Sequence, residues 1–400
     1  MSGLLNSVYN NLTFALQLHS RALLGLQEQA ATGSRINRPS DDPSDAYRVM
    51  GLNSQQRYLA NFTDNIETTM SAQQMAASVL QNISTTLTDT IAHLTQIING
   101  TYGEGEGGQS ARNRVAAEIN DVLEQMVAAA NTKHVDQYLF AGDNTAAVPY
   151  QVERDDGEIT RITYQGSIDG RNIEVAPGVH SYITCAGDAI FSSNNRQTPV
   201  FYGATGAAAG SGTSSVKGDL WLTVTHDGSN YKLSIDGGAT ETTVPTVGDI
   251  SNIAVTNAYG EVLYVDATNI TATGAERIRV PGTHDIFNVL ISTRDLLRNS
   301  MGLSDTALVN LIDAAAASLD EARNAIVDKE SAIGSRINFL DSLKNSLENL
   351  KFNEEDEAAK LEEADIAQIA IDISRKQALY EMSLSIVGRL MSMTILDFLQ

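Results

Sequence analysis

The last thirty-five residues, 366–400, constrain the fold of this chain more than any other stretch. Apolar side chains recur there at alternating steps of three and four residues, with no proline and a single glycine, Gly388. Such a 3.5-residue repeat places side chains on one stripe of a helix that packs against a partner helix. From this stripe we predict an assembly interface that includes Ile366, Ile373, Tyr380, Leu384, Val387, Met391 and Phe398.

The other end of the chain carries a matching repeat. Its predicted interface residues are Leu5, Tyr9, Leu12, Leu16, Leu23 and Leu26. Residues 1–30 and 366–400 each have a net charge of zero, whereas the whole chain carries a formal net charge of −22. The two ends can therefore pack without charge repulsion, while the acidic body keeps free subunits apart. We predict a terminal coiled-coil assembly domain formed by residues 1–42 and 353–400.

Long helices are expected next to both ends. Gly33 provides a stop for the first helix, and Asp42 followed by Pro43 reads as the N-cap and first residue of a second helix. The apolar repeat predicts helices over about 43–98, 110–137 and 305–352, with the acidic run 354–357 as a solvated connector. These helices define a predicted rod domain of residues 43–141 and 283–352.

The middle of the chain differs from both ends in its composition and in its pattern of apolar residues. Five of the seven prolines lie in residues 142–282, among short alternating runs and turn pairs that predict hairpins over 150–164 and 220–235. Residues 203–218 are rich in Gly, Ala, Ser and Thr, and they either divide this insert into two modules or form one long loop. The expected fold class is α+β: a long antiparallel helical bundle or coiled-coil rod formed by both chain ends, with an inserted all-β domain.

Several classes of function are disfavoured by composition. A chain with 49 Asp and Glu against 27 Lys and Arg lacks the basic surface that nucleic acid requires, so no nucleic-acid partner is expected. No run of eighteen apolar residues exists, so no membrane span is expected. The start of the chain lacks a basic segment and an apolar core, so no secretory signal is expected. No residues with catalytic, cofactor-binding or metal-ligand spacing stand out, which argues against an enzyme.

Four blocks of residues match a known family. They are Gly33-Ser34-Arg35-Ile36-Asn37-Arg38-Pro39-Ser40-Asp41-Asp42-Pro43; Tyr138-Leu139-Phe140-Ala141-Gly142; Asp285-Ile286-Phe287-Asn288-Val289-Leu290; and Glu363-Ala364-Asp365-Ile366-Ala367 with the terminal Ile395-Leu396-Asp397-Phe398-Leu399. On these blocks the chain resembles the bacterial flagellins and, within them, the proteins of the hook–filament junction. The resemblance covers residues 1–191 and 283–400. It does not extend to residues 192–282, and Gln400 after Leu399 departs from the pattern.

The resemblance implies a structural subunit that joins the flagellar hook to the filament. It implies copies of the chain in a homo-oligomeric ring within a helical tube, next to a neighbouring hook-associated protein and flagellin. It also implies an export chaperone at the C-terminal helix, and an extracellular location reached by type III export without a cleaved signal peptide.

Two other readings of the chain stay open. One is a filament flagellin; the other is a coiled-coil adhesin or signalling protein whose β insert binds a ligand. From the residues alone we also expect residues 1–30 and 366–400 to be largely disordered in the free subunit, because isolated helices are marginal without packing.

Overall fold

The computed structural model describes residues 2–100, 106–299 and 302–398; the side chains of residues 2–9, 12, 106 and 390–398 lie outside this description. The chain forms two compact units. The first contains residues 1–64 and 343–400, and the second contains residues 65–342. Two long helices, α2 (Pro43–Ile98) and α6 (Asp305–Glu362), contribute residues to both units.

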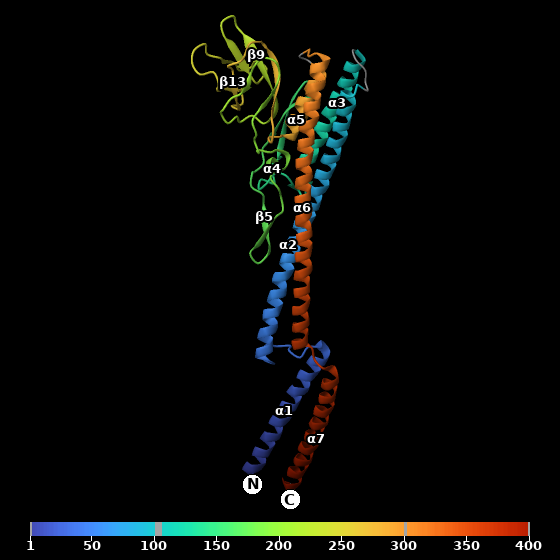
Figure 1. The fold of residues 1–400 in the computed structure, drawn as a ribbon. Helices are drawn as coiled ribbons and strands as arrows, with labels where there is room; N and C mark the ends of the chain where they lie inside the picture. Colours follow the sequence, from blue (N-terminus) through green and yellow to red (C-terminus); the bar gives the residue numbers. More distant parts are fainter. Residues whose placement is uncertain (1, 101–105, 300–301, 399–400) are drawn as a thin grey trace. The chain divides into compact units, whose positions relative to one another are not determined.

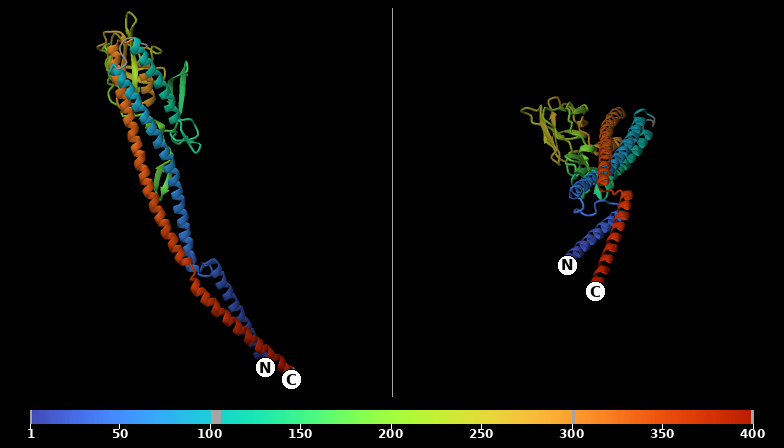
Figure 2. Two further views of the ribbon diagram at one scale, coloured as in Figure 1. Left: turned by 90° about the vertical axis from the view of Figure 1, so that its right-hand side faces the viewer. Right: turned by 90° about the horizontal axis from the view of Figure 1, so that it is seen from below.

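The first unit is entirely helical apart from its connectors. Helix α1 (Ser2–Thr32) and helix α7 (Ile366–Phe398) lie side by side in every view (Figures 1 and 2). Gly33, directly after α1, accepts a hydrogen bond from the N–H of Ala364, which lies two residues before α7, so the two helices run antiparallel. The first turns of α2 and the last turns of α6 complete the unit.

The helical part of the second unit surrounds one apolar core. Helix α3 (Glu106–Ala130) and the short helix α5 (Ile286–Arg298) pack together beside α2 and α6 (Figure 1). Arg294 of α5 is buried and donates to the Ile159 carbonyl (2.7 Å) and to Oδ1 of Asn120 in α3 (3.1 Å). The fully buried members of this core include Leu80, Leu87, Leu94, Ile119, Leu123, Ile312, Leu319 and Ile326.

Three small hairpins and one short helix lie against these helices. The hairpins pair β1 (Lys133–His134) with β2 (Gln137–Tyr138), β3 (Tyr150–Asp155) with β4 (Glu158–Tyr164), and β5 (Asn172–Ala176) with β6 (Val179–Tyr182). Helix α4 (Gly187–Phe191) follows. An aromatic cluster, with ring centroids 5.0–5.9 Å apart, joins these elements to α5 and consists of Phe140, Tyr150, Phe191 and Phe287.

Two antiparallel sheets form the rest of the insert and enclose a second apolar core. The five-stranded sheet has the order β11 (Thr242–Thr243), β10 (Tyr231–Ser234), β9 (Gly218–His226), β14 (Gly274–Val280), β7 (Val200–Tyr202). The three-stranded sheet has the order β12 (Ile253–Thr256), β13 (Val262–Asp266), β8 (Ala208–Ala209). Leu222, Val255, Leu263 and Ile278 are fully buried between them.

A buried ion pair anchors the five-stranded sheet to α6. Arg277 of β14 pairs with Asp219 of β9 at 2.9 Å, and both side chains are 2% exposed. The same guanidinium donates to the Leu311 carbonyl of α6 at 3.0 Å. Nearby, Arg279 pairs with Glu321 of α6. The sheet is therefore held on the helix by charge-assisted hydrogen bonds as well as by apolar packing.

The predicted fold class is confirmed, and so is the helix predicted over 43–98, but two expected boundaries are wrong. The helix expected over 110–137 ends at Ala130, because residues 133–138 form the β1–β2 hairpin. The acidic run 354–357 is not a connector, because α6 continues to Glu362. Lysines one turn away from these acidic side chains offset their repulsion, as in the pairs Lys351–Glu355 and Lys360–Asp356.

Candidate functional site: the terminal helices and their connector

The connector between α1 and α2 is shaped by local backbone chemistry. Gly33 follows the last residue of α1 with a φ of 72°, and its N–H donates to the Gln29 carbonyl at 2.9 Å. This is the left-handed conformation that glycine adopts at low cost. Asp42 precedes Pro43, and its Oδ1 accepts the Asp45 N–H at 3.2 Å. The predicted stop and the predicted N-cap are both confirmed.

Arg35 fixes the connector to the last turn of α6. Its guanidinium pairs with Asp42 at 3.0 Å and with Asp45 at 2.6 Å, and it also donates to the Leu361 carbonyl at 3.0 Å. The Gln29 side chain holds the Arg35 carbonyl at 2.8 Å. Arg35 therefore links three elements: its carbonyl contacts the end of α1, and its guanidinium contacts the start of α2 and the end of α6.

Backbone hydrogen bonds reinforce this link. The Arg35 N–H donates to the Glu362 carbonyl at 2.6 Å, and the Ala364 N–H donates to the Gly33 carbonyl at 3.0 Å. Ser34 and Glu363 form an antiparallel bridge. Beyond it, Asp365 caps α7 by accepting the Gln368 N–H at 3.0 Å. Both terminal helices thus leave from one hydrogen-bonded base.

The charges at this base stabilise one another. Hydrogen bonds from the Asp45 N–H and then from Arg35 hold the pKa of Asp42 below its ordinary value. Hydrogen bonds to Asp45 and then Asp42 raise the pKa of Arg35 in turn. Because these groups are partly exposed to solvent, their pairing defines geometry more than it adds stability.

The predicted interface residues fall into three groups. Three side chains of α1 and three of α7 are half-buried: Leu16, Leu23, Leu26, Ile373, Tyr380 and Val387. Two others, Ile366 and Leu384, are 51% and 46% exposed. The side chains of Leu5, Tyr9, Leu12, Met391 and Phe398 lie outside the described part of the chain.

The helix pair has almost no interior of its own. Among the described side chains of α1 and α7, Ile369 alone is buried, at 7% exposure. Apolar side chains instead face outward on both helices. Those that the predicted stripes missed are Phe14, Leu18 and Leu24 on α1 and Ile371, Met382 and Ile386 on α7.

A helical-wheel reading could have found these outward positions. Phe14 and Leu18 are four residues apart, as are Met382 and Ile386, which is the spacing of side chains on one helix face. Within the same unit, α2 also presents Tyr47, Met50 and Tyr58 to solvent. Because the prediction followed a single stripe on each helix, it did not register that both helices carry apolar side chains on a second face.

Metal-ligand clusters and membrane-spanning helices are both absent from the described residues. No group of three or more His, Cys, Asp or Glu residues within the described ranges is placed to hold a metal ion. None of the helices in that part of the chain combines the length and apolar character that a bilayer crossing needs. The candidate functional surface consists of the exposed apolar side chains of α1 and α7.

Two family models match the chain. The bacterial flagellin N-terminal helical region matches residues 5–145, and the bacterial flagellin C-terminal helical region matches residues 316–399. These matches contain nearly all of α1, the whole of α2, α3 and α7, most of α6, and the connector between α1 and α2. Together they account for more than half of the chain.

Curated relatives and solved structures agree with these matches. Flagellar hook-associated protein 3 of Escherichia coli is 27% identical over 169 residues, which is 42% of this chain and 49% of that protein. Its counterpart in Salmonella typhimurium is 28% identical over 128 residues, which is 31% of this chain and 38% of that protein. The aligned part of the chain thus spans about half, or less, of the length of these relatives.

The likeness in three dimensions extends further along the chain. The crystal structure of flagellar hook associated protein-3 from Legionella pneumophila has a TM-score of 0.53 at 18% identity, covering 78% of this chain and 98% of that one. The FlgL structure from Xanthomonas campestris has a TM-score of 0.50 at 18% identity, covering 78% and 99%. These structures show a shared fold. With both terminal helical regions matched, the chain belongs to the bacterial flagellin family.

Proposed function

We propose that this chain is a structural subunit of the bacterial flagellum that joins the hook to the filament. It would do so by packing its terminal helices against the terminal helices of neighbouring subunits. The observation that carries the proposal is the outward apolar face of each terminal helix, which a lone subunit leaves in water. The names of the curated relatives, flagellar hook-associated protein 3, favour the junction over the filament itself.

Assembly would supply the interior that the helix pair lacks. Ordering a residue costs about 1–2 kcal/mol in backbone entropy, whereas fully burying a large apolar side chain returns about 1.5–3 kcal/mol. With Ile369 as the one buried side chain described in α1 and α7, the free subunit recovers little of that cost. We therefore infer that residues 1–30 and 366–400 acquire most of their order inside the assembled tube.

The proposed partners follow from this mode of packing. Copies of the chain form a ring within a helical tube. A hook-associated protein lies on one side of this ring, and flagellin lies on the other. An export chaperone holds the C-terminal helix before assembly, covering its outward apolar side chains such as Met382 and Ile386. The subunit reaches the cell exterior through type III export. Its role is architectural and involves no catalysis.

Deletion in a motile bacterium tests the proposed role. We expect the deleted strain to retain hooks while it secretes flagellin that does not polymerise, and we expect the intact gene to restore filaments. Normal filaments on the deleted strain would contradict a junction role. Loss of filaments together with loss of secreted flagellin would identify the chain as the filament protein instead.

Limited proteolysis of the purified subunit tests the inference about order. We expect cleavage within residues 1–30 and 366–400 well before cleavage within 65–342. The matched comparison is the same digestion of isolated hook–filament material, where both ends should be protected. Equal resistance of the ends and the body in the free subunit would overturn the inference.

A further inference from the structure

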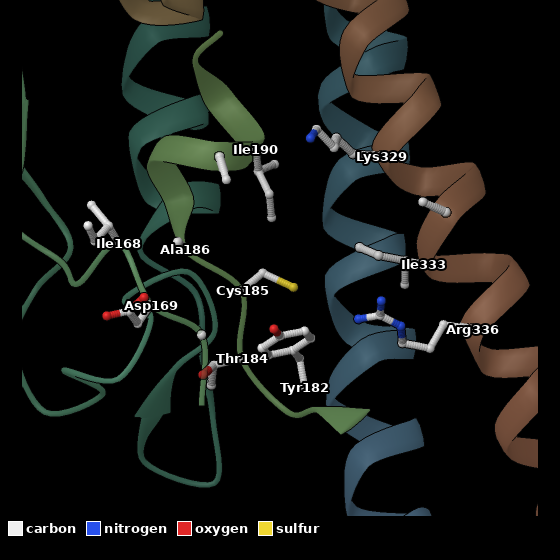
Figure 3. A pocket seen from close by; sticks show the side chains of 13 residues that line it. Ile168, Asp169, Tyr182, Thr184, Cys185, Ala186, Ile190, Lys329, Ile333 and Arg336 are labelled. Atoms are coloured by element: carbon white, nitrogen blue, oxygen red, sulfur yellow. The ribbon is translucent and has the colours of Figure 1, made fainter. Parts of the chain in front are cut away.

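A groove in the second unit has an apolar floor and a cationic rim. It lies between residues 182–190 and one face of α6, with a volume of about 410 Å³ (Figure 3). Ile190 and Ile333 are buried in its floor, and the Cys185 thiol points into it. Such a surface suits an apolar side chain that enters between the two walls.

Two cations stand at the rim of this groove without counter-ions. Lys329 and Arg336 project from α6 on either side of Ile333 (Figure 3), and within the described residues neither forms an ion pair. The Arg336 guanidinium lies 5.4 Å from the centre of the Tyr182 ring. Asp169 also lines the groove, but its carboxylate points away from α6 (Figure 3). In a chain with a net charge of −22, two unpaired cations beside apolar surface favour an acidic, apolar partner.

The β1–β2 turn has the complementary character. Val135 occupies the tip of this turn with 80% of its surface exposed. Its φ of 47° places a β-branched side chain in the left-handed region, which costs free energy. Asp136, also at positive φ, is exposed beside it and has no ion pair within the described part of the chain. An exposed apolar residue held in a strained conformation next to a free carboxylate marks this tip as a candidate contact.

The tip of the β1–β2 turn and the groove are separate surfaces that both lie close to Thr184. Thr184 lines the groove, and it also lines a second recess together with Val135 and His134. A subunit with complementary patches at separate places binds its copies head to tail. Such a heterologous contact generates rings and helical arrays.

We propose that Val135 and Asp136 of one subunit dock in the groove formed by Ile190, Ile333, Lys329 and Arg336 of the next copy. Val135 enters the apolar floor, while the Asp136 carboxylate faces the cations of the rim. This contact rests on the proposed assembly of copies and adds to it a lateral interface outside the terminal helices. Burial of Val135 in the groove also offsets the free-energy cost of its left-handed backbone conformation.

The native thiol in the groove allows a direct test. A chain with Val135→Cys and Cys185→Ser carries its one thiol at the tip, and the native chain carries its one thiol at Cys185. The two chains, one of them tagged, are produced together in a flagellated strain that lacks its own copy. Isolated flagella are treated with a mild oxidant and run on a non-reducing gel. Because burial raises the pKa of the Cys185 thiol, the oxidation is carried out at alkaline pH.

We expect a disulfide-linked heterodimer of the tagged and untagged chains, since docking brings the two thiols within bonding distance. The matched control carries Val247→Cys with Cys185→Ser, because Val247 is equally apolar and 88% exposed; it should yield no heterodimer. Flagella that contain both chains but give no more heterodimer than this control overturn the proposal. Absence of the native chain from the flagella instead counts against the proposed function.

A charge exchange provides a second measurement. Asp136→Lys alone and Arg336→Glu alone should each lower incorporation of the subunit about fivefold, since a close charge pair at a rim becomes a repulsion. The chain with both changes should recover most of that loss, because the pair is restored with opposite polarity. If the double variant is no better than the worse single variant, the proposed contact is wrong.

Discussion

The core of the second unit and the α1–α7 pair are both helical and both apolar, yet they are built differently. The core fills its interior with side chains from four helices, and many of them, such as Leu123 and Leu319, have no exposed surface. The α1–α7 pair has a similar supply of Leu, Ile and Met, but the described part of it buries only Ile369. Apolar content is therefore alike in the two regions, while the number of faces covered differs.

This difference separates stability from assembly. A helix with one covered face and one open face stays marginal alone and gains stability whenever a neighbour covers the open face. A helix within a filled core gains nothing from a neighbour. Substitutions in the two regions should therefore affect different measurements.

The largest effect on unfolding should follow loss of the buried ion pair at the sheet. Arg277→Ala leaves the Asp219 carboxylate buried without a partner, and we expect a loss of about 3–5 kcal/mol in the free energy of unfolding. Chemical denaturation monitored by circular dichroism measures it. Arg279→Ala is the matched control, because its partner Glu321 is more exposed, and it should cost clearly less. Equal losses for both variants would contradict a special role for burial.

A pair of leucine substitutions compares the two regions directly. Leu123→Ala empties a fully buried position and should lower the free energy of unfolding by about 3 kcal/mol. Leu23→Ala, at a half-buried position of α1, should cost less than about 1 kcal/mol in the free subunit. In a motility assay, however, Leu23→Ala should reduce motility more than Leu123→Ala does for each kcal/mol of unfolding free energy that it loses. If both variants lose the same free energy of unfolding, the α1–α7 pair has a packed interior, and the contrast between the two regions is wrong.

A smaller effect is expected at the connector. Arg35→Ala removes two ion pairs and the contact with the Leu361 carbonyl, and we expect a loss of about 1 kcal/mol together with faster hydrogen exchange at residues 33–35. Arg38→Ala is the control, since Arg38 is mostly exposed and contacts Glu28 at 3.3 Å. Unchanged hydrogen exchange at residues 33–35 in the Arg35→Ala variant would show that the backbone hydrogen bonds alone maintain the connector.

The smallest effects should appear as opposite responses to pH. The pKa of Asp42 is lowered in the folded state, so its cap stabilises α2 above the ordinary carboxyl range and weakens as pH falls through it. Burial raises the pKa of Asp285, the N-cap of α5, to about 6, so its contribution is complete at low pH and is lost as pH rises through 6.

Hydrogen exchange at the Asp45 and Phe287 amides, corrected for intrinsic rates, follows the two caps separately. Asp285→Asn keeps a cap but cannot ionise, so it should remove the pH response at Phe287 and leave that at Asp45. A shared direction at both amides would contradict the assigned shifts.

Local chemistry made much of the helical framework predictable. Gly33, Asp42 and Pro43 carry unambiguous stop and start signals, and the second helix was predicted with its observed bounds of Pro43 and Ile98. The β3–β4 and β9–β10 hairpins followed from their turn residues. These elements are set by side chains close in sequence, which a single sequence displays.

The missed features depend on contacts between distant residues or on strain. Val135 and Asp136 form a turn without glycine or asparagine, so nothing in the sequence distinguished residues 133–138 from the end of a helix. The role of Arg35 depends on Leu361, which lies 326 residues away. At the interface, Ile366 and Leu384 are exposed in the single chain, and their contact with a neighbouring subunit stays a prediction.

The hydrogen bonds between residues 33–35 and 362–364 have one more consequence. They close everything between them into a single large loop whose two ends meet at a fixed point. The entropy of closing a flexible loop rises only with the logarithm of its length, by about 0.6 kcal/mol for each doubling. A change in the length of the chain between residues 35 and 362 therefore adds little entropic cost to forming these hydrogen bonds. Related subunits can thus differ in the size of their sheet region while the connector keeps the same hydrogen bonds.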